Sequence, residues 1–223
     1  IRPGVLDTFR AGRHETVAFD RAILCTGAMD RIVPVPGWTL PGVFTLGAAQ
    51  IALKAQGVAI GSRVAFIGTG PLLWLTATQY LKAGAAVALV LDTTPLRTKA
   101  RAAAGLLADP ATFAKGLALV ARLHLAGVRV IEGGTPVALE GTDAVEAVRV
   151  RDRRGREHRI ACDAVGLGFG LKPESQLADL AGVPFRFEAI ERNWVPERDR
   201  AGRTPVAGLY LAGDGAGIAG ADA

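Results

Sequence analysis

The pattern of hydrophobic and polar positions divides the chain into three blocks. Residues 1–61 alternate short apolar runs with turns and end in a helix-like stretch. Residues 62–171 follow a regular order of strand, glycine turn, helix and strand. Residues 171–223 have little regular pattern until an apolar strand runs into glycines and one aspartate.

The first block contains short strands and one helix. Apolar runs predict strands around residues 17–19 and 22–26, and the second ends in Thr-Gly-Ala. A proline-rich linker with one tryptophan follows. Helical periodicity then predicts a helix over residues 46–56, closed by Gly57.

The second block opens with a βαβ unit. A continuous apolar strand covers residues 64–67, a Gly-Thr-Gly turn follows at 68–70, and a helix runs from Pro71 to about Ala83. A second apolar strand ends at Asp92. Continuous rather than alternating apolar strands are typical of a parallel sheet that is covered on both faces. The fold class that follows is α/β.

The rest of the second block predicts further helices and strands. Helices are expected over residues 95–108 and 112–126, and several strands between residues 128 and 168. The last strand ends at Gly168, which we include among the candidate cofactor-binding residues. No repeat of solenoid period and no low-complexity tract is present.

Composition indicates a globular protein. The chain has 223 residues, of which 50% are hydrophobic and 21% charged, enough for one large domain or two small ones. The longest apolar runs, such as residues 85–91, are much shorter than a bilayer span, and no secretory leader is present. These features favour a cytoplasmic protein with no transmembrane segment.

The net charge of +5 comes mainly from scattered arginines. One cluster of arginines lies at residues 149–159, where charged residues alternate with others. This pattern predicts a solvated β-hairpin that turns at Arg154-Gly155. We favour this interpretation over a nucleic-acid groove, so no nucleic-acid partner is expected.

Cysteine and histidine spacing gives no catalytic or metal signature. Cys25 and Cys162 each lie in an apolar strand-like run without CxxC spacing, which predicts buried, inert thiols. His14, His124 and His158 are isolated from one another in sequence, so we expect surface or helix-face residues and no metal site.

The glycine turn of the βαβ unit is the strongest chemical signal. Gly68 and Gly70 let the backbone turn tightly, and Pro71 favours a helix start whose free N–H groups attract a pyrophosphate. Asp92 is placed to accept hydrogen bonds from a ribose diol, and its charge disfavours NADP. However, Leu73 occupies the third glycine position and would push the helix outward. A purely structural turn, with Asp92 as a helix cap or a solvated turn residue, is the alternative.

The order of these motifs resembles the pyridine nucleotide-disulfide oxidoreductase family. The strand-turn "ILCTGA", the proline linker, the βαβ unit and the closing "LYLAGDGAG" follow one another as in its flavoproteins with two dinucleotide-binding domains. The resemblance implies that Thr26, Gly27 and Ala28 belong to an FAD-binding domain. It also implies that Gly213 and Asp214 form the closing motif, in which the aspartate accepts a hydrogen bond from the flavin ribitol.

Longer segments are similar to one branch of that family. "RIVPVPGWTLPGVFTLGAAQ", "GTGPLL" and "NWVPERDRAGRTPVAGLYLAGDGAGIAGADA" resemble the α (A) subunits of bacterial opine oxidases, hydrogen cyanide synthase and related D-hydroxyproline or proline dehydrogenases. The family's N-terminal GxGxxG fingerprint is absent, so we expect an internal fragment that binds FAD weakly or not at all. The domains implied are an FAD-binding part at 1–60, a Rossmann-like NAD-type insert at 61–170, and a return to the incomplete FAD-binding domain at 171–223.

The resemblance implies a nucleotide-binding α subunit of a hetero-oligomeric amino- or imino-acid dehydrogenase, with FAD and NAD(H) or another adenine nucleotide as cofactors. Its expected partner is a catalytic β subunit of amino-acid-oxidase type, and a further candidate is an iron–sulfur subunit. No catalytic residue is assigned, and a disulfide reductase is disfavoured because Cys25 and Cys162 lie in different blocks. The alternatives are an NADH-dependent flavin reductase of the ferredoxin-reductase kind and a non-catalytic scaffold that holds an adenine nucleotide.

Overall fold

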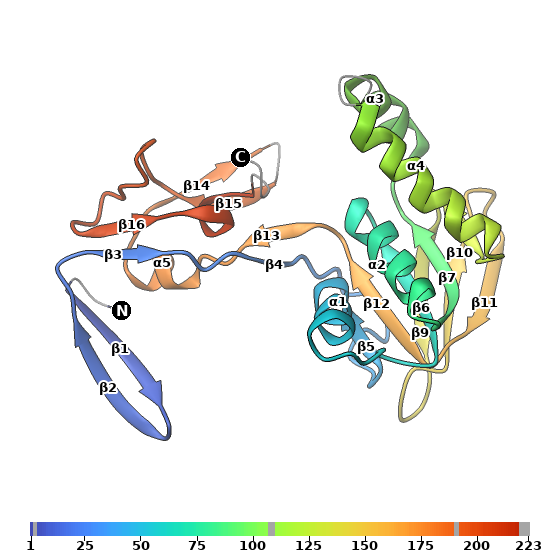
Figure 1. The fold of residues 1–223 in the computed structure, drawn as a ribbon, viewed down its shortest axis with the longest axis horizontal. Helices are drawn as coiled ribbons and strands as arrows, with labels where there is room; N and C mark the ends of the chain where they lie inside the picture. Colours follow the sequence, from blue (N-terminus) through green and yellow to red (C-terminus); the bar gives the residue numbers. More distant parts are fainter. Residues whose placement is uncertain (2–3, 107–109, 190–191, 219–223) are drawn as a thin grey trace. The chain divides into compact units, whose positions relative to one another are not determined.

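The computed structural model describes residues 1, 4–106, 110–189 and 192–218 (Figure 1). The chain forms two compact units. Unit 1 consists of residues Ile1–Met29 and Leu171–Ala223, and unit 2 consists of residues Asp30–Gly170.

Unit 2 is built on a five-stranded parallel sheet. Its strand order is β5-β12-β6-β7-β8. The first strand of the βαβ unit, β6, is therefore the central strand, and the second, β7, lies beside it. The strands are β5 (Val43–Thr45), β6 (Arg63–Gly68), β7 (Ala86–Asp92), β8 (Val130–Glu132) and β12 (Ala164–Gly168).

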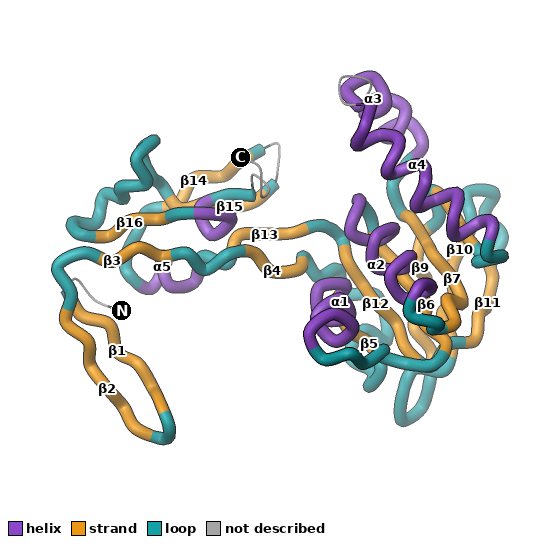
Figure 2. The backbone as a smooth tube through the Cα atoms, in the orientation of Figure 1, coloured by secondary structure: helices purple, strands orange, loops and turns teal. Residues whose placement is uncertain are grey.

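Helices cover one face of this sheet (Figures 1 and 2). Val64 and Phe66 of β6 point into a buried cluster that also contains Leu46, Leu73 and Tyr80 from the helices. Leu73 is fully buried, so its side chain is enclosed in the core rather than left at the surface. The helices of unit 2 are α1 (Leu46–Ala55), α2 (Pro71–Lys82), α3 (Leu96–Leu106) and α4 (Pro110–Leu125).

A second, antiparallel sheet packs against the other face. Ala65 and Ile67, which alternate with the helix-facing positions of β6, share a second buried cluster with Leu139, Val148 and Ile160. Because both faces of β6 are covered, the run from Val64 to Ile67 is continuously apolar, and only Arg63 at the start of the strand is exposed. The sheet has the order β11-β10-β9 and comprises β9 (Thr135–Glu140), β10 (Ala147–Arg151) and β11 (Glu157–Ala161).

Unit 1 contains smaller elements around a third buried cluster. Leu24 of β3 and Leu211 of β16 lie in this cluster, and the two strands pair in parallel. The elements are β1 (Val5–Arg10), β2 (Arg13–Ala18), β3 (Ala22–Leu24), β4 (Ala28–Asp30, which extends one residue into unit 2), β13 (Leu171–Pro173), α5 (Gln176–Leu180), β14 (Phe185–Glu188), β15 (Asn193–Pro196), β16 (Leu209–Leu211) and the 3-10 helix η1 (Gly213–Ala216).

The regular elements of the second block agree with the sequence predictions. The βαβ unit and the hairpin at Arg154-Gly155 are both present, and so is the helix predicted at the end of the first block. The predicted helix over residues 95–108 is seen to Leu106, and its last two positions lie outside the described residues. The expectation of an irregular third block is wrong, because its strands are three or four residues long and too short to show a period.

The linker and the first helix belong to unit 2 in the structure. The sequence assigned residues 30–60 to the FAD-binding part, whereas the compact unit begins at Asp30. The reason is pairing at long range: β5 is the edge strand beside β12, and the N–H of Leu139 donates to the carbonyl of Pro36 at 2.8 Å. Asp30 also accepts a hydrogen bond from the N–H of Gly47, at the start of α1, at 2.9 Å.

Candidate functional site

The carboxyl ends of three neighbouring strands bring three predicted site residues into one row. Gly68 at the end of β6 is in register with Asp92 on one side and with Gly168 on the other. In open parallel sheets, ligands bind at the carboxyl ends of the strands. The structure therefore places these candidates at the edge where a dinucleotide site is expected.

Gly68 and Gly70 are required for two different reasons. A Cβ on Gly68 would collide with the carbonyl oxygen of Gly168, so strand packing alone demands glycine there. Gly70 has φ +85°, and nothing lies within 4 Å of the position that its Cβ would take. An open space beside a left-handed glycine leaves the backbone accessible to a ligand.

Helix α2 begins directly after this open space. Gly70 is the N-cap, Pro71 lies in the first turn, and no side chain caps the N–H groups of that turn. The first turn also has no acidic residue. Uncapped N–H groups and the positive end of the helix dipole form a site for an anion, and the residues present therefore fit a pyrophosphate group.

Threonines that the sequence analysis did not single out fix the geometry of this edge. Thr93 donates to the carbonyl of Gly68 through its N–H at 2.8 Å and through its hydroxyl at 3.1 Å. The hydroxyls of Thr69 and Thr94 are 2.5 Å apart. The Thr-Thr pair directly after the strand-ending Asp92 was the signal in the sequence.

Asp92 is buried and already has two partners. Its side chain is 2% exposed, and Oδ1 accepts a hydrogen bond from the N–H of Thr94 at 2.9 Å. Its Oδ2 lies 2.6 Å from Nζ of Lys99, on α3. The same ammonium is 2.5 Å from Glu132, at the end of β8, and 5.5 Å from the centre of the Trp74 ring.

This ion-pair cluster alters the electrostatics predicted for the site. Burial lowers the pKa of Lys99, but hydrogen bonds to Asp92 and Glu132 outweigh it, and the net effect raises the pKa. Lys99 is therefore charged at neutral pH and neutralises the carboxylate of Asp92. The sequence-based argument that Asp92 repels a 2′-phosphate is correspondingly weakened, since an ammonium lies beside that carboxylate.

The candidate FAD residues gather at a similar edge in unit 1. Strands β3 and β16 pair in parallel with Leu24 opposite Leu211, and the N–H of Ala212 donates to the carbonyl of Leu24 at 3.1 Å. A glycine with positive φ lies close after the end of each strand, with φ 75° at Gly27 and 69° at Gly213.

The two turns lie against each other. A Cβ on Gly215 would come within 2.5 Å of the hydroxyl oxygen of Thr26, and that hydroxyl donates to the carbonyl of Glu174. By contrast, nothing lies within 4 Å of the Cβ positions of Gly27 and Gly213. The open sides of both turns fit a flavin nucleotide, with Thr26, Ala28 and Asp214 as their neighbours in the chain.

One of the two cysteine predictions was wrong. Cys162 is buried, and desolvation raises its pKa to about 11. Cys25, however, is exposed, and it directly follows Leu24, the last residue of β3. The two thiols belong to different compact units.

His14 and His124 are exposed, as expected, whereas His158 is half-buried and hydrogen-bonded on both ring nitrogens.

Among the described helices, none combines the length and the apolar character that crossing a bilayer requires.

Comparison with known proteins identifies the family. The model of the pyridine nucleotide-disulphide oxidoreductase family matches residues 4–222. The A subunit of opine oxidase from Agrobacterium tumefaciens (strain Ach5) is 42% identical over 217 residues, covering 96% of this chain and 42% of the relative. The HcnB subunit of hydrogen cyanide synthase from Pseudomonas protegens is 33% identical, covering 94% and 46%. The chain belongs to the pyridine nucleotide-disulphide oxidoreductase family.

More distant similarities support the same fold. The ferredoxin reductase component of a chlorobenzene dioxygenase from a Cupriavidus species is 31% identical, covering 90% of this chain and 44% of the relative. The crystal structure of L-proline dehydrogenase from P. horikoshii superimposes with a TM-score of 0.62 at 21% identity, covering 96% and 34%. The expected α/β flavoprotein fold is thereby confirmed, and the family supports FAD and NAD(H) as cofactors. The chain spans less than half the length of these curated relatives.

Proposed function

We propose that this chain is the nucleotide-binding part of an α-type subunit in a hetero-oligomeric dehydrogenase that oxidises an amino or imino acid, such as an opine, a proline derivative or glycine. The observation that carries the proposal is the uncapped start of α2 beside the open space at Gly70. Similarity to a subunit named for opine oxidation supports the choice of substrate class. A cytoplasmic location remains a prediction from composition.

In unit 2 the backbone binds the nucleotide. The N–H groups of the first turn of α2 hold the pyrophosphate, and the missing side chain of Gly70 allows its approach. Asp92 ends the neighbouring strand, where the adenine ribose binds in such folds, and the ammonium of Lys99 on α3 lies beside its carboxylate. Ribose binding by Asp92 would require its carboxylate to share or exchange the hydrogen bond from Lys99.

In unit 1 the paired turns after β3 and β16 hold the flavin nucleotide. Gly27 and Gly213 supply close backbone approach, and Asp214 accepts a hydrogen bond from a ribitol hydroxyl. When bound, FAD and the pyridine nucleotide supply redox chemistry that no side chain can provide. The role of this chain is to bind and orient the two nucleotides, while substrate oxidation takes place in a partner β subunit of amino-acid-oxidase type. An iron–sulfur subunit is a further candidate partner.

An NADH-dependent flavin reductase of the ferredoxin-reductase kind is the second candidate. The relative that is a ferredoxin reductase component of a dioxygenase favours it. Both candidates use the glycine turn of unit 2, but only a reductase transfers hydride from NADH to its flavin rapidly. The third candidate is a non-catalytic scaffold that holds ADP or ATP and does not turn over NADH.

Titration of the chain with NADH, ADP and ATP, followed by calorimetry, tests the nucleotide site directly. Addition of NADH to an intact, flavin-loaded homologue under anaerobic conditions then separates the candidates. Slow or absent flavin bleaching supports the α-subunit proposal, and bleaching within the dead time of mixing favours the reductase. Failure of all three nucleotides to bind would contradict every candidate.

A further inference from the structure

A cavity in unit 2 lies apart from the glycine turn. Its volume is about 580 Å³, and it is formed between the start of β8 and the turn of the β10–β11 hairpin. Cavities of this size hold small ligands. Its polar lining includes Arg129, Asp152, Arg153, Arg154, Arg156 and His158.

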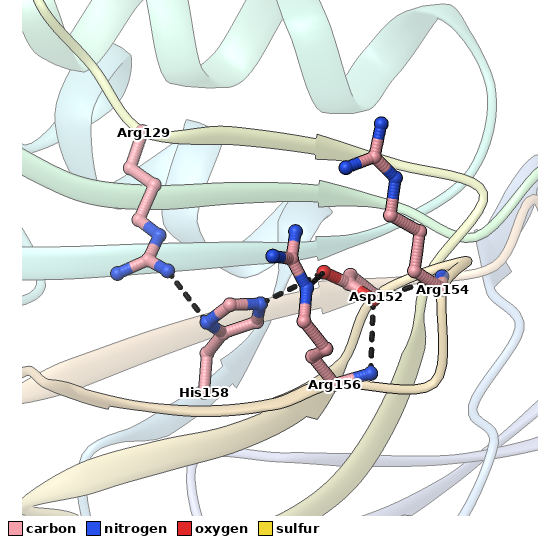
Figure 3. Close-up of polar contacts among 5 residues, drawn as sticks. All are labelled: Arg129, Asp152, Arg154, Arg156 and His158. Carbon is pink, nitrogen blue, oxygen red and sulfur yellow. Dashed lines mark hydrogen bonds and ion pairs between the residues drawn. The ribbon is translucent and has the colours of Figure 1, made fainter.

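Asp152 organises the hairpin turn at the edge of this cavity (Figure 3). Its Oδ1 accepts hydrogen bonds from the N–H groups of Arg154 at 2.8 Å and Arg156 at 3.0 Å. Its Oδ2 lies 3.2 Å from Nε of Arg156 and 3.0 Å from Nε2 of His158. The hydrogen bond from His158 is the largest of the effects that lower the pKa of Asp152, so the carboxylate is ionised and its acceptor positions are occupied.

His158 connects the hairpin to the start of β8. Figure 3 shows its ring between Asp152 and Arg129, with Nδ1 2.8 Å from Nη2 of Arg129. A guanidinium can only donate hydrogen bonds, so Nδ1 accepts and the ring proton sits on Nε2, facing the carboxylate. His158 is therefore a neutral bridge that holds the Arg129 guanidinium beside the cavity.

The cavity keeps more positive charge than the structure neutralises. Glu132, which also lines it, is paired with Lys99 at 2.5 Å, and Asp152 is paired with Arg156. Within the described part of the chain, Arg153, Arg154 and Arg129 have no carboxylate within ion-pair distance. Guanidinium groups from two separate elements thus share one concave surface, which concentrates positive potential there.

We propose that this cavity binds a small phosphate-bearing polyanion, such as a diphosphate group. Arginine binds phosphate through its planar set of N–H donors. Three guanidinium groups offer more donors than the two oxygens of one carboxylate can accept, whereas a diphosphate has more terminal oxygens and a higher charge. The exposed head groups of Arg153 and Arg154 can adjust to the ligand, while Arg129 is held by His158.

The test is calorimetric titration of the whole chain with inorganic pyrophosphate at low ionic strength. Because pyrophosphate could also reach the start of α2, the titration is done in a Gly70→Ala background, and binding should persist there. Arg154→Ala should weaken binding about 10-fold, as expected for a lost charge-assisted contact. Arg151→Ala is the matched control, because Arg151 lies on the same hairpin and is paired with Glu157 at 2.7 Å. It should change affinity less than about 2-fold.

Each other outcome would overturn the proposal. Equal losses in Arg154→Ala and Arg151→Ala would show binding to general surface charge, and absent binding would show that the cavity is not a phosphate site. Citrate that binds as tightly as pyrophosphate would contradict the choice of phosphate. NADH titration of Arg154→Ala keeps this inference separate from the nucleotide site at Gly70, since NADH affinity should be unchanged. A parallel loss of NADH affinity would mean that the two sites are one.

Discussion

The ammonium of Lys99 lies 2.6 Å from a carboxylate oxygen of Asp92, the buried residue that ends the second strand of the βαβ unit. The pair links α3 to β7, and Glu132 extends it to β8. It gives Asp92 a structural role at the nucleotide-binding edge, in addition to the ribose contact that we propose.

Replacement of Lys99 by methionine should lower the free energy of unfolding by about 2–4 kcal/mol, because it leaves the carboxylate of Asp92 buried without a counter-charge. Urea unfolding measures the change. Lys82→Met is the control, since Lys82 is an exposed residue at the end of α2 and should change stability by less than about 0.5 kcal/mol. Equal stability of Lys99→Met and the native chain would show that the pair contributes nothing.

The contribution of Lys99 should disappear at high pH. Its pKa is raised above the ordinary value of 10.5, so the folded state binds this proton more tightly than the unfolded state. The stability difference between the native chain and Lys99→Met should therefore be constant from about pH 7 to pH 9. It should shrink as the pH rises through the folded-state pKa, above about pH 10.5. Urea unfolding of both proteins at several pH values checks this, and a difference that grows with pH would contradict it.

The two thiols should react at very different rates. Cys25 is exposed, whereas Cys162 is buried and its pKa is raised to about 11. Because the thiolate is the reactive form, Ellman's reagent at pH 8 should modify Cys25 rapidly and Cys162 only after denaturation. Cys25→Ser should abolish the rapid phase. A rapid reaction in Cys25→Ser would mean that Cys162 is accessible.

In the intact protein, Asp214→Ala should weaken flavin binding by roughly 10-fold, in line with the loss of a hydrogen bond to a charged acceptor. Flavin fluorescence titration measures this loss. Asp179→Ala, at an exposed aspartate on α5, controls for the removal of one negative charge from unit 1. Unchanged affinity in Asp214→Ala would remove the aspartate from the proposed flavin site.

Local patterns predicted the centre of unit 2 well. The βαβ unit was predictable because strand, glycine turn and helix follow one another within about thirty residues and each has its own period. The position of Asp92 beside Gly68 also follows from this pattern, since carboxyl ends of parallel strands share one edge, whereas Gly168 joins them through the distant strand β12.

Contacts between distant segments were not predictable from periodicity. The apolar run at residues 22–26 predicted a strand with a buried Cys25, but Ile23 is 65% exposed and Cys25 is exposed, whereas Leu24 between them lies in the core. Likewise, nothing in the local sequence indicates that Lys99 reaches Asp92 or that His158 bridges Asp152 and Arg129. These contacts depend on how helices and hairpins pack after the sheet has formed.

The central claim is that the start of α2 binds the pyrophosphate of a nucleotide through the open space at Gly70. Gly84, just beyond the other end of the same helix, is a control for alanine at a glycine with positive φ. Both glycines have φ +85°, and neither has an atom within 4 Å of its Cβ position. Gly70 combines φ +85° with ψ 177°, a backbone region that is essentially restricted to glycine, so alanine there should cost about 1–3 kcal/mol of strain. Urea unfolding of Gly70→Ala measures this strain separately from nucleotide affinity.

The most direct measurement is calorimetric titration of NADH and ADP into the native chain, Gly70→Ala and Gly84→Ala. We predict that Gly70→Ala lowers the affinity for both nucleotides by about 10-fold or more, because its Cβ occupies the space that the phosphates approach. Gly84→Ala should bind as the native chain does. Equal affinity in all three proteins would contradict the account, because the nucleotide would then bind elsewhere.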